Sequence, residues 1–169
     1  MIQHIWSVLC TRSILDSTSN SISLIDSLEE IAVGGIDLAD LRMKIAEGRK
    51  VMVPMTSELV TLWSRGPDDE PDRGKGRLII TQPGGATVTG PEYDIDLSKY
   101  KRLRQRSQNP GLPFVGPGRY VFRVQVQNAI GEWLDMASVP LWVHLEEEKK
   151  TVEAATPEAP GSPAVPATH

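Results

Sequence analysis

Positive charge is concentrated in one short run of the chain, "SKYKRLRQRSQ", residues 98–108. The run interleaves cations with one aromatic ring, and its candidate binding residues are Lys99, Tyr100, Lys101, Arg102, Arg104 and Arg106. Arginine and lysine beside a ring that can stack are suited to phosphates, a nucleic-acid strand or an acidic protein surface. The alternative is a solvated loop whose charges offset acidic segments elsewhere. We expect the stretch from Lys99 to Pro113 to form a loop, with the candidate binding residues in its part 99–106.

The other residue types that do chemistry form no recognised pattern. The acidic segment "DDEPDRGKG", residues 68–76, lacks the ligand spacing and the final glutamate of an EF-hand loop. The three histidines, His4, His144 and His169, show no ligand pairing, and the sequence has no G-x-S-x-G elbow or phosphate-binding glycine loop. The sequence therefore predicts no catalytic residue, no metal and no cofactor. A hydrolase whose site is assembled from distant residues is kept as an alternative.

Composition limits the class of protein. A chain of 169 residues suits one domain that buries its own core. The net charge is −4, of which residues 146–169, with five Glu and two Lys, contribute −3 and leave −1 for the rest. A nearly neutral body predicts no strong field for nucleic acid or for an anionic membrane.

The cellular location is inferred from three features. The single cysteine, Cys10, cannot form an internal disulfide and lies in the apolar run "IWSVLC", which predicts a small buried side chain. The N-terminal stretch lacks the basic region and cleavage site of a signal peptide. No apolar run approaches the roughly 20 residues of a membrane helix. We expect a cytoplasmic protein with no membrane contact.

Domain boundaries follow from the composition of the C-terminal end. The segment "EEKKTVEAATPEAPGSPAVPATH" is rich in Pro and Ala and almost free of large apolar residues. Such a segment cannot bury enough surface to fold. We predict a β-sandwich domain over residues 1–147 and a disordered tail over residues 148–169.

The first half of the chain mixes strand and helix patterns. "IQHIWSVLC" is rich in branched and aromatic residues, which favours a buried strand. Residues 21–33 fit a helical stripe or a strand face, and strand neighbours favour a strand. Residues 36–48, "IDLADLRMKIAEG", carry apolar residues at helical spacing and end in Gly48, so they predict one short helix. Further extended segments are "KVMVPM", "SELVTLWSR", "RLIITQ", "ATVTG" and "YDIDL".

The end of the body predicts a β-hairpin. In "YVFRVQVQ", residues 120–127, alternation puts Tyr120, Phe122, Val124 and Val126 on a core face and Arg123, Gln125 and Gln127 on a wet face. Residues 128–131, "NAIG", suit a type I turn. The returning strand "WLDMASVPLWVHL" has as its apolar face Trp133, Ala137, Val139, Leu141, Val143 and Leu145. Pro140 cannot donate a ladder hydrogen bond, so we expect a sheet edge or a bend there.

About seven or eight short strands, with Gly and Pro between them and at most one short helix, are typical of an all-β fold. We expect a mainly antiparallel, two-sheet β-sandwich of Ig-like or C2-like type. Its segment order "WSVLC", "SISLIDSLEEI", "ELVTLWSR", "LIITQPGG", "GLPFVGPGRYVFRVQV" and "WLDMASVPLWV" resembles a group of short, uncharacterised bacterial proteins. The residues that carry this resemblance are Gly118, Tyr120, Phe122 and Pro140. The resemblance implies a β-sandwich and no assigned activity or catalytic residues.

Two functional hypotheses follow. The first is a non-enzymatic module that binds another protein or self-associates through loops at one end or an uncovered sheet edge. The alternative is binding of a polyanion or nucleic acid through the basic loop 99–106, which predicts an affinity that falls as salt rises.

Overall fold

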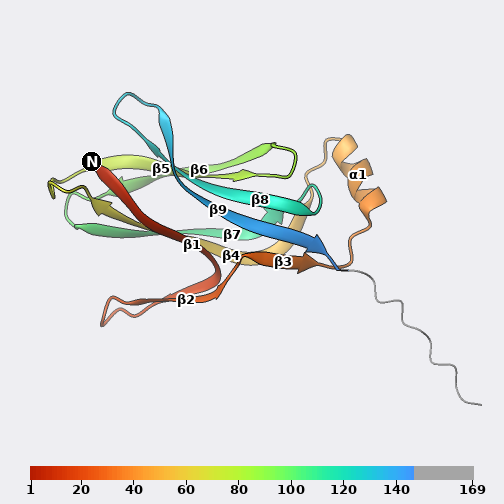
Figure 1. Ribbon diagram of the computed structural model, residues 1–169, viewed down its shortest axis with the longest axis horizontal. Coiled ribbons are helices and arrows are strands. Elements are labelled where there is room, and N and C mark those ends of the chain that lie inside the picture. Colours follow the sequence, from red (N-terminus) through yellow and green to blue (C-terminus); the bar gives the residue numbers. More distant parts are fainter. Residues whose placement is uncertain (147–169) are drawn as a thin grey trace, which may run out of the picture.

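The computed structural model describes residues 1–146, which form two packed β-sheets and one short helix. Nine strands are present in these residues, and the helix α1 lies at the end opposite the N-terminus (Figure 1). The predicted all-β, two-sheet fold is confirmed. The predicted tail, residues 148–169, and the domain boundary at residue 147 lie outside the described residues.

The first sheet has the strand order β2-β1-β4-β7 and is antiparallel throughout. Its strands are β1 (Ile2–Leu15), β2 (Ile22–Ser27), β4 (Met52–Arg65) and β7 (Arg102–Pro113). The second sheet has the order β3-β9-β8-β5-β6, and only its β3–β9 pair is parallel. Its strands are β3 (Glu30–Val33), β5 (Arg73–Thr81), β6 (Thr87–Asp96), β8 (Gly118–Gln127) and β9 (Trp133–Leu145).

The core lies between the two sheets. Alternate residues of each strand face it, so Leu59 and Trp63 of β4 meet Tyr120 and Phe122 of β8 in one buried cluster. All four side chains are at most 2% exposed. The buried hydroxyl of Tyr120 donates to the Gly116 carbonyl at 2.9 Å. Its phenol therefore keeps a hydrogen-bond partner inside the core.

The ambiguous segment 21–33 is extended, as predicted, but it forms two strands that belong to different sheets. β2 pairs with β1 in the first sheet and β3 pairs with β9 in the second. The chain crosses between the sheets at Leu28 and Glu29: the Leu28 N–H donates to the Leu9 carbonyl, and the Trp142 N–H donates to the Glu29 carbonyl. This crossing adds one strand to those predicted, and β7, which lies in a segment predicted as a loop, adds another. In contrast, β4 and β6 each join two segments that were predicted as separate strands.

The predicted helix is confirmed as α1, Leu38–Ala46. The Asp37 side chain accepts from the Ala39 N–H at 2.8 Å, which satisfies one of the free donors at the helix start. Gly48, with φ of +72°, follows its end. Within residues 1–146, no helix is both long enough and apolar enough to cross a membrane.

Strand β1 changes partner along its length, and this places the polar cluster described below. From Ile2 to Cys10 it pairs with β4, and from Cys10 to Leu15 it pairs with β2. Figure 1 shows the β1–β2 hairpin projecting away from the rest of the first sheet. We call the point where β1 leaves β4, at Cys10 and Glu58, the strand fork.

The late hairpin is confirmed, with one correction to its faces. β8 and β9 pair antiparallel, and the turn closes through a hydrogen bond from Gly131 N–H to the Asn128 carbonyl at 3.0 Å. The prediction that Trp133 shares a face with Ala137 is wrong. An irregularity in the β8–β9 register at Val124 and Gln125 shifts the alternation, so Trp133 lies on the outer face.

The polar face of β8 is also less exposed to solvent than predicted. Gln125 is only 6% exposed, because Arg77 and Asp135 cover it from the neighbouring strands.

Pro140 precedes Trp142, where β9 begins to pair with β3. It therefore lies on a part of β9 that has β8 as its only strand partner among the described residues, which confirms the predicted edge position.

Candidate functional site

The structure corrects the predicted loop at residues 99–106. Lys99, Tyr100 and Lys101 lie in the connection between β6 and β7, whereas Arg102 begins β7. The β7 residues pair in register with β4, from Ser64 opposite Arg102 to Met52 opposite Pro113. The basic run is therefore mostly an edge strand of the first sheet.

Alternation along β7 sorts its basic residues onto one face. Leu103 packs against the core, so Arg102, Arg104 and Arg106 lie on the opposite, outer face of the first sheet. The sequence contained this signal, because "RLRQR" alternates in polarity. The density of charge and the lack of branched apolar residues argued for a loop instead.

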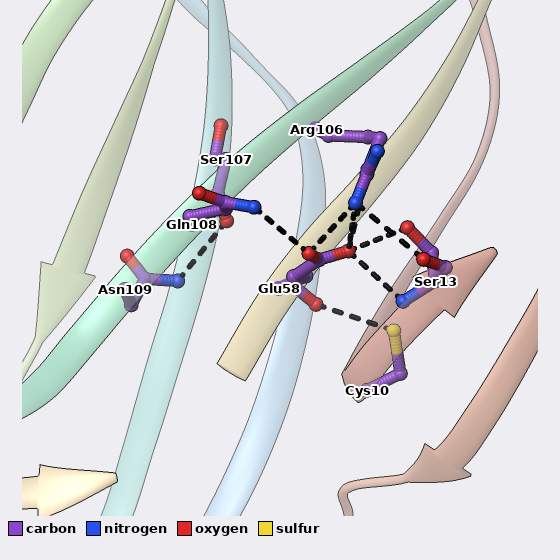
Figure 2. Close-up of polar contacts among 7 residues, drawn as sticks. All are labelled: Cys10, Ser13, Glu58, Arg106, Ser107, Gln108 and Asn109. Carbon is purple, nitrogen blue, oxygen red and sulfur yellow. Dashed lines mark hydrogen bonds and ion pairs between the residues drawn. The ribbon is translucent and has the colours of Figure 1, made fainter. Parts of the chain in front are cut away.

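Arg106 belongs to a buried polar cluster around Glu58, which Figure 2 shows. The Glu58 side chain is almost fully buried, at 6% exposed. Arg106 Nη2 lies 2.9 Å from Glu58 Oε1 and 3.2 Å from Oε2, and Gln108 Nε2 donates to Oε1 at 3.1 Å. From β1, Ser13 donates its backbone N–H at 3.0 Å and its hydroxyl at 2.5 Å to Oε2. Three strands thus converge on one carboxylate.

This cluster has a structural cause at the strand fork. Beyond Cys10, β1 no longer pairs with β4, so the Ser13 N–H has no carbonyl of β4 opposite it. The Glu58 carboxylate accepts that N–H instead, while the Cys10 thiol donates to the Glu58 carbonyl at 3.6 Å. A buried backbone donor needs a partner, and this carboxylate supplies one. The prediction that Cys10 is buried is confirmed.

The cluster holds Glu58 in its charged form. Burial raises the pKa of this carboxyl, but hydrogen bonds from Arg106, Ser13 and Gln108 outweigh burial and lower the pKa to about 2. A catalytic acid or base needs a pKa near the working pH. Glu58 and Arg106 therefore form a structural ion pair, and the Arg106 guanidinium already has an acid as its partner.

Two more of the predicted binding cations also have partners within the chain. Lys101 forms an ion pair with Asp69, and the Lys101 ammonium lowers the pKa of the Asp69 carboxyl. Arg104 Nη1 donates to Asn20 Oδ1 at 2.8 Å, which ties β7 to the tip of the β1–β2 hairpin. These contacts occupy side chains whose positive charges a bound polyanion would need as partners.

The remaining members of the predicted site are exposed. Lys99 and Arg102 are open to solvent, and Tyr100 is 68% exposed. Arg102 and Lys101 line a shallow hollow of about 410 Å³ together with Trp6, Leu62 and Asp69. The structure thus brings two of the predicted residues together beside an aromatic ring, but it also places an acid among them.

The two histidines in the described residues do not complete a catalytic constellation. His4 Nε2 lies 2.9 Å from Ser7 Oγ, which lies 2.9 Å from Thr61 Oγ1, and the ring packs edge-on against Trp63. No carboxylate of residues 1–146 contacts His4 in this chain of hydrogen bonds. His144 pairs with Glu30 at 3.1 Å on the surface. Within the same residues, no group of three or more His, Cys, Asp or Glu side chains is placed to hold a metal ion.

A separate candidate surface, which sequence reasoning missed, lies where the edges of β1 and β9 meet. Among the described residues, Ile2–Val8 of β1 pair only with β4, and Trp133–Leu141 of β9 pair only with β8. A cavity of about 730 Å³, which we call the β1–β9 opening, lies where β1 begins, beside the start of β5 and the β8–β9 turn. Its lining includes Ile2, Val126, Ile130, Leu134 and Met136.

The β1–β9 opening exposes apolar side chains that the core does not use. Ile130, in the β8–β9 turn, is 79% exposed, and Leu134 is 48% exposed. Polar residues border them: Asp72, which precedes β5, and Arg73 and Lys75 at the start of β5. An apolar centre with a polar rim is the usual anatomy of a protein interface. Neither Ile130 in a turn nor Leu134 on a strand gave a distinct sequence signal.

Comparison of the chain with protein-family models, curated proteins and solved structures gives no match. The resemblance to short bacterial proteins therefore stays a prediction, and the function is argued from the geometry alone.

Proposed function

We propose that this chain is a non-enzymatic protein-binding or assembly module and that it binds its partner at the β1–β9 opening. The observation that carries the proposal is the exposure of Ile130 and Leu134 beside an apolar cavity. Exposed apolar groups gathered on one surface and bordered by polar residues mark interaction sites in folded proteins.

The strand edges beside this opening support a particular mode of contact. Ile2–Val8 and Trp133–Leu141 each have one edge that no strand of residues 1–146 occupies. An extended segment of a partner can add to such an edge through backbone hydrogen bonds, and alternate side chains can then enter the cavity. The partner is another protein or a second copy of this chain that offers an extended apolar segment.

The test combines self-association with partner capture. Sedimentation velocity of the full chain measures self-association, and the immobilised full chain is used to capture partners from a lysate of the host. The proposal predicts a stable oligomer or one stoichiometric partner. Replacing Ile130 with Asp should weaken the contact at least tenfold, because a charge at the centre of an interface removes apolar burial.

The matched control is Met43→Asp. Met43 is on α1, is 54% exposed and lies outside the opening, so the same change of chemistry should leave binding intact. A wild-type chain that stays monomeric and captures no partner would overturn the proposal. Equal capture by the Ile130→Asp variant and the wild type would overturn the assignment to this opening.

Polyanion binding through residues 99–106 stays the alternative hypothesis. Exposure of Lys99, Tyr100 and Arg102 supports it, whereas the pairing of Lys101 and Arg106 with acids weakens it. Salt-dependent binding of single-stranded nucleic acid that is lost in a Lys99→Gln, Arg102→Gln variant would support it over protein binding. A cytoplasmic location is part of the same proposal, and the buried, unpaired Cys10 is consistent with it.

A further inference from the structure

A second opening lies on the other side of the sandwich, where the edge strands β6 and β7 face each other. It contains a cavity of about 470 Å³, which we call the β6–β7 opening. Its lining residues come from both sheets and from the segment after α1, among them Ile45, Lys50, Met52, Leu78, Ile80, Val88 and Phe114. This volume lies in the range of roughly 300–1,000 Å³ that is usual for small-molecule sites.

We propose that the β6–β7 opening binds a small amphiphilic carboxylate, with its apolar chain between the sheets and its carboxylate beside Lys50. The inference is independent of protein binding at the β1–β9 opening. It rests on the mainly apolar lining, on strand edges that are unsuited to a peptide, and on the charge at its rim.

The lining of the opening is mainly apolar, with Gln82 and Asn109 as its uncharged polar members. Leu78, Ile80 and Phe114 belong to the core and form its inner part. At the rim, apolar side chains from separate elements remain exposed: Val88 of β6 is 39% exposed and Met52 of β4 is 51% exposed. An alkyl chain in this space would remove apolar surface of both the chain and the rim from water.

The two facing edges are irregular at the opening. The β5–β6 register shifts between Arg77 and Ile79, so Gly90 and Pro91 on β6 form a bulge there. On β7, Gly111 lines the opening, and a Cβ at this position would come within 3.1 Å of Met52 Cε and of the Val53 carbonyl. Glycine at position 111 therefore lets β4 approach β7 closely beside the opening, while the bulge interrupts the regular edge of β6.

The same edges are unsuited to a peptide strand. Pro91 lies on the β6 edge, and Pro110 and Pro113 lie on the β7 edge. Proline has no N–H to donate, and a bulge interrupts the row of hydrogen-bonding groups that an added strand needs. These edges therefore favour an occupant that has an apolar chain and no peptide backbone.

Charge at the rim selects the head group. The lining contains two cations, Arg49 and Lys50, and no Asp or Glu. Arg49 pairs with Glu47 at 2.7 Å, so Lys50, which is exposed, is the cation better placed to receive an anion. A carboxylate is the simplest anionic head group that an alkyl chain carries, and it complements an ammonium group directly.

Isothermal titration calorimetry of the full chain with octanoate, decanoate and dodecanoate, each below its micelle concentration, tests the proposal. We expect one site, with Kd falling by about fourfold for each added methylene that enters the cavity. Dodecanol and dodecylamine, which share the chain but lack the negative charge, should bind more weakly than dodecanoate. No binding of any of the three carboxylates at millimolar concentration would overturn the proposal.

Two variants test whether the carboxylate binds at the β6–β7 opening. Val88→Trp should fill the opening and reduce dodecanoate affinity at least tenfold, and Lys50→Gln should weaken dodecanoate several-fold without changing dodecanol binding. Lys99→Gln is the matched control, because Lys99 is an exposed lysine outside the opening. Unchanged circular dichroism and melting temperature show that each variant is folded. Dodecanoate binding that survives Val88→Trp but is lost in Ile130→Asp would assign the ligand to the β1–β9 opening and overturn the proposal.

Discussion

Each sheet carries one cluster of polar and charged side chains that spans three strands, and the two clusters differ in burial. In the first sheet, Arg106 and Ser13 converge on Glu58, whose side chain is 6% exposed. In the second sheet, Arg123 of β8 pairs with Asp135 of β9, and their side chains are 32% and 42% exposed. The first cluster has removed a carboxylate from water, whereas the ion pair of the second remains at the surface.

The difference follows from the strand pairing beneath each cluster. Glu58 lies at the strand fork, where its carboxylate replaces a missing ladder partner for Ser13. In the second sheet the β8–β9 ladder is continuous apart from one irregularity, so side chains of β8 and β9 only add to existing backbone pairing. A charge that completes the backbone hydrogen bonding of a buried fork should therefore matter more than a charge that lies over an intact sheet.

The largest expected effect is at the fork. Glu58→Ala should lower the free energy of unfolding by about 3–5 kcal/mol, because it leaves the Arg106 guanidinium and the Ser13 N–H without their acceptor. Urea denaturation measures the change. Glu58→Gln, which keeps the shape and part of the hydrogen bonding, should cost less. A loss below about 1 kcal/mol for the Ala variant would show that the fork needs no buried charge.

Acid should selectively weaken the same cluster. The pKa of Glu58 is lowered from 4.5 to about 2 in the folded chain, so the unfolded chain takes up this proton first. The stabilisation is complete above the unfolded value of 4.5 and is lost as the pH falls toward 2. The loss is on the order of 3 kcal/mol.

The control for this pH effect is the Glu58→Gln variant, which has no proton to take up. Unfolding by urea at successive pH values should show a stability difference between wild type and variant that shrinks below about pH 5. Arg123 also lowers the pKa of Asp135, but that carboxyl is exposed. Asp135→Asn should therefore change the acid profile much less, and an equal change would contradict the contrast between the clusters.

An intermediate effect is expected at Gln125, the buried member of the second cluster. Its side chain accepts from Arg77 Nε at 2.8 Å and donates to Asp135 Oδ1 at 2.9 Å, while Arg77 lies 4.1 Å above the ring of Trp133. Gln125→Leu should cost about 1–2 kcal/mol in urea denaturation. Gln127→Leu, on the same face but bonded only to the Gly131 carbonyl, is the matched variant and should cost less.

The smallest effect should come from the exposed ion pair. Arg123→Gln should destabilise by about 0.2–1 kcal/mol, because a surface pair gains little beyond its hydration. Added NaCl should reduce this difference further, since salt screens exposed charges. A cost as large as that of Glu58→Ala would remove the proposed distinction between the two sheets.

Sequence patterns predicted the fold class and most elements, but not the state of the basic run. The late hairpin and α1 have strong local signals: alternation in residues 120–127, the turn at residues 128–131 and the spacing of residues 36–48. Arg102–Arg106 lack branched apolar residues, and they are extended because β4 offers them a partner strand. Strand propensity depends on such context more than helix propensity does.

The candidate sites were less predictable than the elements. The basic run predicts Arg106 and Lys101 as binding residues, yet each has an acid as its partner from a distant part of the chain. Trp133 was assigned to the core face because alternation was extended through Gln125, where the register shifts. A register irregularity leaves no fixed mark in the sequence, so every residue beyond it is assigned to the wrong face.

The sequence by itself determined the alternation of residues 120–127, the turn at residues 128–131 and a short helix within residues 36–48. These features depend on neighbours a few residues apart, whose backbone preferences and polarity act locally. Only the tertiary structure decided that Glu58 completes a strand fork and that the two sides of the sandwich open differently. Those outcomes depend on which strands become neighbours: Ser13 and Arg106 are separated from Glu58 by 45 and 48 residues. Burial, which comes only with those contacts, turns an ordinary glutamate into a stabilising charge.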